Sequence, residues 1–275
     1  LKIKEYKSGQ KVFDWRIPSE WNVNDAYVKY KNKKIIDFKK NNLHLVGYSQ
    51  PIEKFVNKQE LFKHIHTYKK IKNVIPYVTS YYKKYWGFCL SENEKNKIKG
   101  NNFYVKIDSK FKKNGSLSIG ELIIKGKSKF EVLLSANICH PSLANNELSG
   151  PTLLTYLGKF LSMRKNNYTY RILFIPETIG SITYLSKNLK KLKKYTIAGF
   201  HLTCIGDKGK FSLIETKNSN SYSENIVKNL YDKKKLKVYK FIECGSDERQ
   251  YNYPGVDIPV VTLTRSKFGS YKEYH

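Results

Sequence analysis

The sequence has few cysteines, and their spacing limits what they can do. The four cysteines, Cys89, Cys139, Cys204 and Cys244, lie far apart and include no Cys-x-x-Cys pair. Disulfide-stabilised secreted domains and zinc knuckles have cysteines at short, regular spacings. The spacing therefore argues against both classes and favours reduced thiols in a cytoplasmic protein.

Long apolar runs are absent. No run approaches the roughly 20 residues that cross a bilayer, and no signal peptide is recognisable at the N-terminus. The chain starts at Leu1 rather than at a methionine, and His275 directly follows a patterned stretch. We therefore expect no membrane partner, and we expect a fragment that lacks sequence at both ends.

Acidic residues are scarce, and arginine is scarce among the basic ones. The chain has 51 basic and 23 acidic residues, a net charge of +28. Such a charge suggests a nucleic-acid partner, but a nucleic-acid surface is usually rich in arginine. The arginines number five: Arg16, Arg164, Arg171, Arg249 and Arg265. The lysines are spread along the whole chain, which favours solvated faces and leaves nucleic-acid binding as the weakest alternative.

The 275 residues are enough for one large or two modest domains. Residues 1–11 form a polar lead-in to the main domain. Residues 12–118 contain short alternating runs rich in aromatic residues, which predict a small β-rich inserted domain. Within it we expect a hairpin connection at 31–33 and a short helix over 57–66 capped by Asn57.

Residues 119–275 alternate between apolar runs and amphipathic segments. This alternation predicts an α/β domain with a mostly parallel sheet flanked by helices. The predicted strands are Val132–Ile138, Arg171–Ile175, Ile197–Thr203, Val238–Ile242 and Pro259–Leu263. The predicted helices are Pro151–Met163, Ile179–Leu192 and Ser221–Tyr231.

Residues able to do chemistry follow the ends of these predicted strands, where α/β sheets place their active sites. They are His140, Asn146, Glu147, Glu177, the Thr203-Cys204 pair, Ser246-Asp247-Glu248 and His275. Two histidines and a carboxylate that converge would suit a catalytic zinc, which takes three protein ligands and keeps an open position. A further carboxylate could act as general base. A single histidine after a strand is more often structural, so the indication comes from the joint occurrence of these residues at strand ends. His64 and His66 could also suggest a metal pair, but residues i and i+2 of a helix do not face each other.

Several motifs resemble a known family. HPSLANNELSG, PETIGS and GSDERQY resemble the metal-binding loop, the glutamate segment and the final Ser-Asp segment of M28-type zinc aminopeptidases. The chain is more similar still to the aminopeptidase-like proteins of the DUF4910/DUF2172 type, through VFDWRIPSEWNVNDAY, FIPETIGSI and YKEYH as well. The resemblance spans nearly the whole chain. It implies a peptidase-like α/β domain with a small inserted β domain.

The resemblance also implies roles for individual residues. His140 and His275 match the two metal-binding histidines, and Glu177 matches the general base that activates metal-bound water. Asn146 stands where M28 enzymes have an aspartate that bridges two metals, and Thr178 stands where they have a metal-binding glutamate. Thr203-Cys204 occupies the region of a further aspartate.

These neutral positions favour one Zn²⁺ over two, because two divalent ions need several carboxylates to offset their charge. Glu147 or Asp247 would complete the zinc site. Glu147 has the alternative role of a residue at a helix N-terminus. Asp247 has the alternative roles of orienting a ligand or binding a substrate amine. Arg249 would pair with a substrate carboxylate, or else with a neighbouring acidic residue.

The leading hypothesis is a zinc-dependent, aminopeptidase-like hydrolase of a small peptide or amide, with Glu177 as base. The alternative is a degenerate peptidase fold that binds a ligand or partner without hydrolysis. Neutral Asn146 and Thr178 motivate that alternative.

Overall fold

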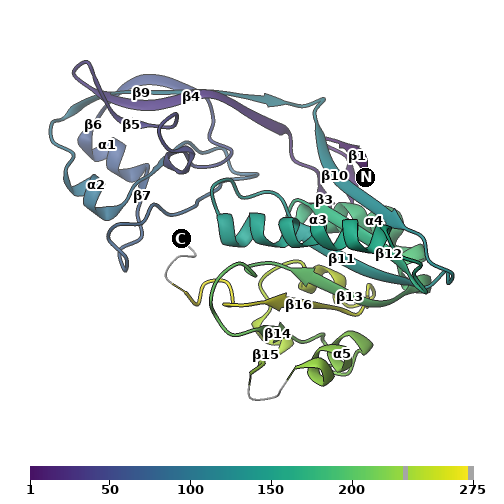
Figure 1. Ribbon diagram of the computed structural model, residues 1–275. Coiled ribbons are helices and arrows are strands. Elements are labelled where there is room, and N and C mark those ends of the chain that lie inside the picture. The colour runs from purple at the N-terminus through teal and green to yellow at the C-terminus, as the bar shows by residue number, and fades with distance from the viewer. Residues whose placement is uncertain (232–234, 272–275) are drawn as a thin grey trace. The chain divides into compact units, whose positions relative to one another are not determined.

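The computed structural model describes residues 1–231 and 235–271, which form two compact units (Figure 1). The first unit contains Leu1–Ile17 and the described residues from Leu117 onward. The second contains Pro18–Ser116. The second unit is therefore inserted into the sequence of the first.

An eight-stranded sheet forms the centre of the first unit, in the order β1-β10-β12-β11-β13-β16-β14-β15. Its strands are β1 (Lys2–Lys7), β10 (Ser116–Ile124), β11 (Glu131–Asn137), β12 (Thr169–Ile175), β13 (Thr196–Leu202), β14 (Ser212–Ile214), β15 (Lys237–Tyr239) and β16 (Val260–Thr264). The neighbours β12, β11, β13 and β16 run parallel to one another, whereas β10 and β14 pair antiparallel with β12 and β16. The predicted α/β class with a mostly parallel sheet is confirmed.

The helices of this unit lie on both faces of the sheet (Figure 1). They are α3 (Ser149–Ser162), α4 (Ile179–Tyr195), α5 (Tyr222–Leu230) and α6 (Glu248–Tyr251), with short turns η2 (Ala144–Leu148) and η3 (Phe241–Glu243). Neighbouring residues of β11 belong to different cores. Leu133 packs with Leu185 of α4, and Leu134 packs with Leu154 of α3. Burial on both faces explains why apolar residues stand next to one another at Val132–Leu134 of β11.

The boundaries of the two units differ from those predicted. The expected lead-in, residues 1–11, contains β1, which is the edge strand beside β10. The paired strands β2 (Lys11–Val12) and β3 (Trp15–Arg16) also belong to the first unit. Val12 and Ile17 are buried in its core. The polar sequence of β1 hid this pairing, because an edge strand needs only one apolar face.

The second unit is built on a four-stranded antiparallel sheet in the order β5-β4-β9-β6. Its elements are β4 (Glu20–Tyr30), β5 (Lys33–Asp37), η1 (Asn42–His44), β6 (Ile52–Asn57), α1 (Lys58–Lys63), β7 (Ile65–His66), β8 (Phe88–Cys89), α2 (Glu92–Asn96) and β9 (Asn102–Lys112). It has a core of its own, which includes Val28, Leu61, Phe88 and Phe103.

The predicted helix over 57–66 is shorter in the structure, because α1 ends at Lys63 and Ile65–His66 form the strand β7. The predicted cap is confirmed. Asn57 caps α1 by accepting a hydrogen bond from the Glu60 N–H at 2.8 Å. His64 stacks on Trp86, with 3.6 Å between ring centroids, and His66 contacts the hydroxyl of Tyr85 at 2.9 Å. Both histidines therefore have packing roles.

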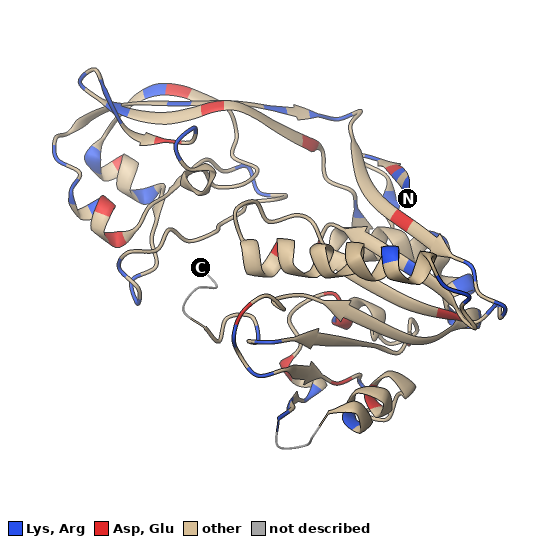
Figure 2. Ribbon diagram, viewed as in Figure 1, with Lys and Arg blue, Asp and Glu red and all other residues tan. Residues whose placement is uncertain are grey.

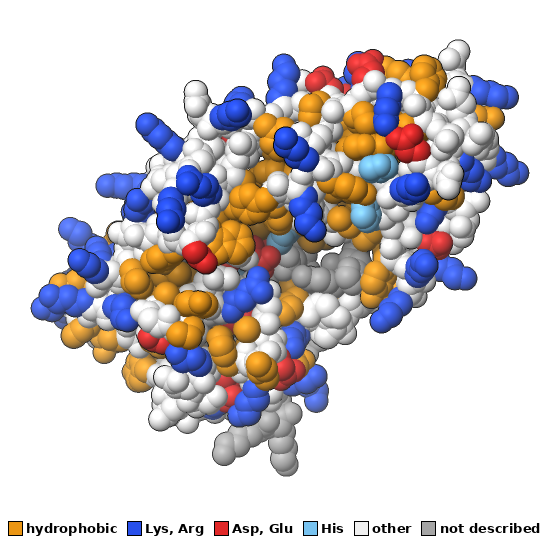
Figure 3. Space-filling view, turned by 180° about the vertical axis from the view of Figure 1, so that it is seen from behind, with side chains coloured by type: hydrophobic (Ala, Val, Ile, Leu, Met, Phe, Trp, Pro, Cys, Tyr) orange, Lys and Arg blue, Asp and Glu red, His pale blue; other side chains and the backbone are white. Residues whose placement is uncertain are grey.

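Lysine and arginine residues are distributed along the chain in both units instead of being gathered in one segment (Figure 2). The face seen in Figure 3 carries lysine and arginine side chains singly, separated by apolar and neutral ones. This distribution matches the solvated lysines predicted from the sequence.

Candidate metal and catalytic site

The candidate site lies at the carboxyl edge of the parallel strands. β11 and β12 run side by side with Asn137 opposite Ile175. The segments that follow carry His140 and Glu177, so the parallel register brings these two residues to the same edge. His140 Nε2 lies 3.7 Å from Glu177 Oε2. His140 and Glu177 therefore lie next to each other at this edge, as the sequence predicts.

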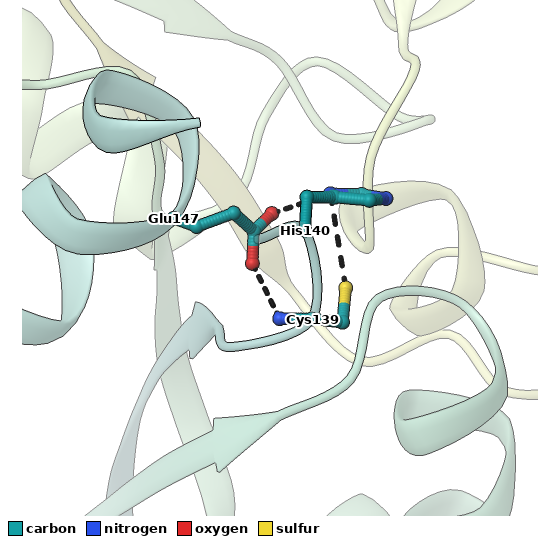
Figure 4. Close-up of side chains that lie close together, drawn as sticks. All are labelled: Cys139, His140 and Glu147. Carbon is teal, nitrogen blue, oxygen red and sulfur yellow. Dashed lines mark hydrogen bonds and ion pairs between the residues drawn. The ribbon is translucent and has the colours of Figure 1, made fainter. Parts of the chain in front are cut away.

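Three side chains converge beside this edge: Cys139, His140 and Glu147 (Figure 4). Their potential ligand atoms all lie within 4.8 Å of one another. Glu147 Oε1 is 2.6 Å from His140 Nδ1, and its Oε2 accepts the backbone N–H of Cys139 at 2.6 Å. Cys139 Sγ lies 3.8 Å from His140 Nδ1. Nitrogen, sulfur and carboxylate oxygen are the ligand types that zinc prefers.

The carboxylates around His140 control its protonation. Burial alone would lower the pKa of His140, but the hydrogen bond to Glu147 and the charges of Glu147 and Glu177 outweigh it and raise the pKa. Burial would raise the pKa of Glu147, but the hydrogen bond and charge of His140 lower it overall. Both shifts favour the charged forms of His140 and Glu147, whose ring nitrogen and carboxylate oxygen are 2.6 Å apart.

Glu177 has two carboxylate oxygens with different surroundings. Its Oε1 accepts hydrogen bonds from Ser246 Oγ at 2.6 Å and from Asn137 Nδ2 at 3.2 Å. Its Oε2 faces His140. Burial raises the pKa of Glu177, although the hydrogen bond from Ser246 partly opposes this. A carboxylate with a raised pKa beside a metal-ligand cluster suits a general base.

Asn146 supports the cluster instead of offering an oxygen to it. Its Oδ1 accepts hydrogen bonds from Thr203 Oγ1 at 3.0 Å and Cys204 Sγ at 3.4 Å. Its Nδ2 donates to Glu147 Oε1 at 3.0 Å. The amide oxygen that could bind a metal is therefore directed toward Thr203, and Asn146 acts by orienting Glu147.

Asp247 is not one of the three residues of the Cys139–His140–Glu147 cluster, although its charge acts on His140. It is fully buried, and its Oδ1 accepts hydrogen bonds from the Thr178 N–H at 2.7 Å and Ser181 Oγ at 2.8 Å. Burial and the charge of Glu177 raise its pKa to about 8. Thr178 has φ of 63°, an uncommon conformation for a threonine. Asp247 therefore braces the strained residue that follows Glu177.

Arg249 contacts the same residue, since its Nη2 donates to Thr178 Oγ1 at 3.3 Å. This contact involves only part of the guanidinium group. His275, the second histidine implied by the resemblance, lies outside the described residues.

Sequence reasoning missed two residues near this site. The spacing of the cysteines indicates only a reduced thiol at Cys139, although its place beside His140 in the strand-end loop is a signal for a role in the site. His201 lies within β13 and is fully buried, with Nε2 3.1 Å from Ser246 Oγ. Nothing in the sequence distinguishes it from an ordinary core residue.

Comparison with known proteins assigns the chain to a family. A family model described as a domain of unknown function (DUF4910) matches residues 1–275. The chain belongs to the DUF4910 family. This confirms the resemblance expected from the sequence motifs.

A curated relative of this DUF4910 chain comes from Clostridium acetobutylicum and is named for polysaccharide biosynthesis and an aminopeptidase-like domain. It is 45% identical over 278 residues, which include all of this chain and 63% of the relative. The chain thus spans less than two thirds of that relative's length. A crystal structure from Clostridium acetobutylicum, named as that of a peptidase, matches with a TM-score of 0.93 and 45% identity, over 98% of this chain and 64% of the other.

A more distant solved structure shows the fold alone. The zinc aminopeptidase BSAP from Bacillus subtilis matches with a TM-score of 0.66 at 13% identity, over 99% of this chain and 77% of the other. The DUF4910 chain therefore has the zinc aminopeptidase-like fold. Among its described residues, no helix combines the length and apolar composition of a membrane span.

Proposed function

We propose that the chain is a zinc-dependent, aminopeptidase-like hydrolase of a small peptide or amide. The observation that carries this proposal is the Cys139–His140–Glu147 cluster beside Glu177. The fold of BSAP and the names of the Clostridium relatives support it. One zinc per chain is proposed, because Asn146 and Thr203 are neutral and are hydrogen-bonded to each other.

The donor set fits a single zinc. Cys139, His140 and Glu147 would hold it as three protein ligands, and His275 would join or replace one of them as the resemblance implies. Zinc, when bound, supplies Lewis acidity and lowers the pKa of a coordinated water. Binding requires neutral His140, so it would displace the proton that His140 shares with Glu147.

Glu177 is proposed to move the proton. Its Oε2 faces the cluster and would accept a proton from the attacking water, then return it to the leaving amine. Asn137 and Ser246 hold the other oxygen, so the carboxylate keeps one orientation. Arg249, at the edge of the site, is proposed to bind a substrate carboxylate.

Glu177→Gln tests the role of the base. The amide cannot take a proton, so turnover of an aminoacyl-amide substrate should fall by at least about a hundredfold. Zinc content should stay unchanged, because Glu177 is not proposed as a ligand. Glu53→Gln, an exposed glutamate in the other unit, is the matched control. Activity retained in Glu177→Gln would exclude the assignment.

Cys139 as a ligand has a spectroscopic test. Protein loaded with Co²⁺ in place of zinc should show a thiolate-to-cobalt charge-transfer band in the near ultraviolet. Cys139→Ser should lose this band, and Cys244→Ser should keep it. Bound cobalt with no such band in the unaltered protein would remove Cys139 from the ligand set.

One observation favours a second candidate function, a fold that binds a peptide without cleaving it. The neutral residues Asn146 and Thr203 satisfy each other, so this part of the site is complete without metal. Calorimetry with a dipeptide would distinguish the two, since this function predicts binding without turnover in zinc-supplemented protein.

A small peptide or amide is the proposed partner, and no nucleic acid or membrane partner is proposed. We also propose a cytoplasmic location. All four cysteines are free thiols, which supports a reducing compartment.

A further inference from the structure

Three buried polar side chains are linked by successive contacts that lead to Glu177. Ser135, His201 and Ser246 come from β11, β13 and the segment before α6, and each is at most 2% exposed. Ser135 Oγ lies 3.0 Å from His201 Nδ1, His201 Nε2 lies 3.1 Å from Ser246 Oγ, and Ser246 Oγ lies 2.6 Å from Glu177 Oε1. These contacts form a continuous path that ends on the carboxylate.

The amide of Asn137 fixes the direction of the last two bonds. Its Nδ2 donates both to Glu177 Oε1 and to Ser246 Oγ, each at 3.2 Å. The other orientation of this amide would set its oxygen against the carboxylate. Since Ser246 Oγ accepts from Asn137, its single proton is free to donate to Glu177 Oε1.

The direction of the remaining bonds follows. The proton of Ser246 is used on Glu177, so His201 Nε2 must carry the hydrogen that lies between it and Ser246. Burial lowers the pKa of His201 well below its ordinary range, so the imidazole is neutral. A neutral imidazole has one donor and one acceptor nitrogen. His201 Nδ1 is then the acceptor, and Ser135 donates to it.

We propose that Ser135, His201 and Ser246 form a one-way hydrogen-bond network that positions Glu177, with every donor pointing toward its Oε1. The consequence is that Oε1 is engaged by the network, and Oε2 is the oxygen that faces His140. His201 and Ser246 touch neither the metal cluster nor a substrate, and they are positioning residues. The inference rests on the proposed function in that Glu177 is the base.

The network explains why a histidine occupies the interior of β13. An apolar residue at position 201 would leave Ser246 Oγ without one donor and free its hydroxyl to rotate away from Glu177. Loss of an outer partner of this kind typically costs about tenfold to a hundredfold in activity. The loss should appear in kcat with little change in KM, because the network orients a catalytic group and does not contact the substrate.

Kinetics with paired variants test the positioning role. Ser246→Ala and His201→Leu should each lower kcat about tenfold to a hundredfold with KM within about twofold. Ser246→Thr keeps a hydroxyl and His201→Gln keeps a donor, so both should recover most of kcat. Ser212→Ala removes an equally buried serine hydroxyl outside the network and is the control. Circular dichroism and urea unfolding confirm that each variant is folded. Unchanged kcat in folded Ser246→Ala and His201→Leu would overturn the proposal.

Nuclear magnetic resonance tests the network without any activity. Long-range ¹H–¹⁵N spectra report the tautomer of each histidine, and His201→Gln identifies the signals of His201 by their loss. His201 should be a single neutral Nε2–H tautomer at pH 7 and should become a mixture in Ser246→Ala. An Nδ1–H tautomer or a charged ring would overturn the network. The Nε2–H tautomer in a protein with no turnover would support the network and refute the proposed hydrolase.

Discussion

Asp247 carries the largest electrostatic cost among the acidic residues around the site. It is completely buried, and its Oδ2 has no hydrogen-bond partner among the described residues. Burial, followed by the charge of Glu177, raises its pKa from an ordinary 3.8 to about 8. Between these values the native state keeps a proton that the unfolded chain releases. Unfolding therefore becomes easier as the pH rises through this window, by up to about 1.4 kcal/mol per pH unit.

Asp247→Asn should remove this pH dependence. The variant keeps an oxygen for Thr178 and Ser181 and has no charge to bury. In metal-free protein its stability should equal that of the unaltered protein at about pH 3.5 and exceed it by more than about 3 kcal/mol at pH 8. Urea unfolding at both pH values measures this difference, and a difference that does not change with pH would contradict the account.

Asp207→Asn should change the stability of the protein in the opposite direction to Asp247→Asn. Burial would raise the pKa of Asp207, but hydrogen bonds from Gly209, Asn145 and Ser266 lower it overall. A lowered carboxylate pKa stabilises the native state above the unfolded pKa and loses this contribution as the pH falls. Asp207→Asn should therefore be less stable than the unaltered protein at pH 7.

Individual site residues differed in how far the sequence could predict them. His140 and Glu177 could be found because each directly follows an apolar strand. The contact between Asn146 and Thr203 could not be found, since it depends on where η2 lies relative to the end of β13. The orientation of the Asn146 side-chain amide could not be predicted either, because its partners Thr203 and Cys204 are far away in sequence.

At the level of elements, the close approach of α3 to β13 shapes the site. A Cβ atom added to Gly150 would lie 2.2 Å from the backbone oxygen of Leu202. Only glycine allows this approach, which also keeps η2 beside the end of β13. The Asn146–Thr203 hydrogen bonds lie at that junction.

Gly150→Ala should therefore destabilise the protein by about 1–3 kcal/mol, because the clash is with backbone. Gly158→Ala, in the same helix, is the matched control. Its added Cβ would meet only the side-chain ends of Ile172 and Leu122 at 3.3 Å. It should change stability by less than about 1 kcal/mol. Urea midpoints measure both, and equal effects would contradict the proposed packing constraint.

The elements that the sequence predicted best were the long, strongly patterned ones. The predicted strand Arg171–Ile175 lies within β12, and the predicted helix Ile179–Leu192 corresponds to α4. β14 was missed because three residues give no measurable alternation. β15 is confined to Lys237–Tyr239, because the chain turns into η3 where the strand was expected to continue.

At the scale of the whole molecule, the inserted unit has a hydrophobic core of its own. This core is formed entirely by residues of Pro18–Ser116, including Val28, Phe88 and Phe103. A segment of this size with such a core can fold alone.

We expect residues 18–116 expressed alone to unfold cooperatively in urea. Phe103→Ala in this fragment should cost about 3–5 kcal/mol, because it leaves a cavity at a fully buried site. Fluorescence and circular dichroism should give one coincident transition. A fragment that shows no cooperative transition would mean that the unit depends on the rest of the chain.

The metal content of the purified, zinc-supplemented protein tests the central claim most directly. Elemental analysis should find about one zinc per chain in the unaltered protein and in His66→Ala, whose histidine packs on Tyr85. His140→Ala should lose that zinc, because it removes the only nitrogen ligand of the described cluster. Absence of zinc from the unaltered protein, or its full retention in His140→Ala, would contradict the account.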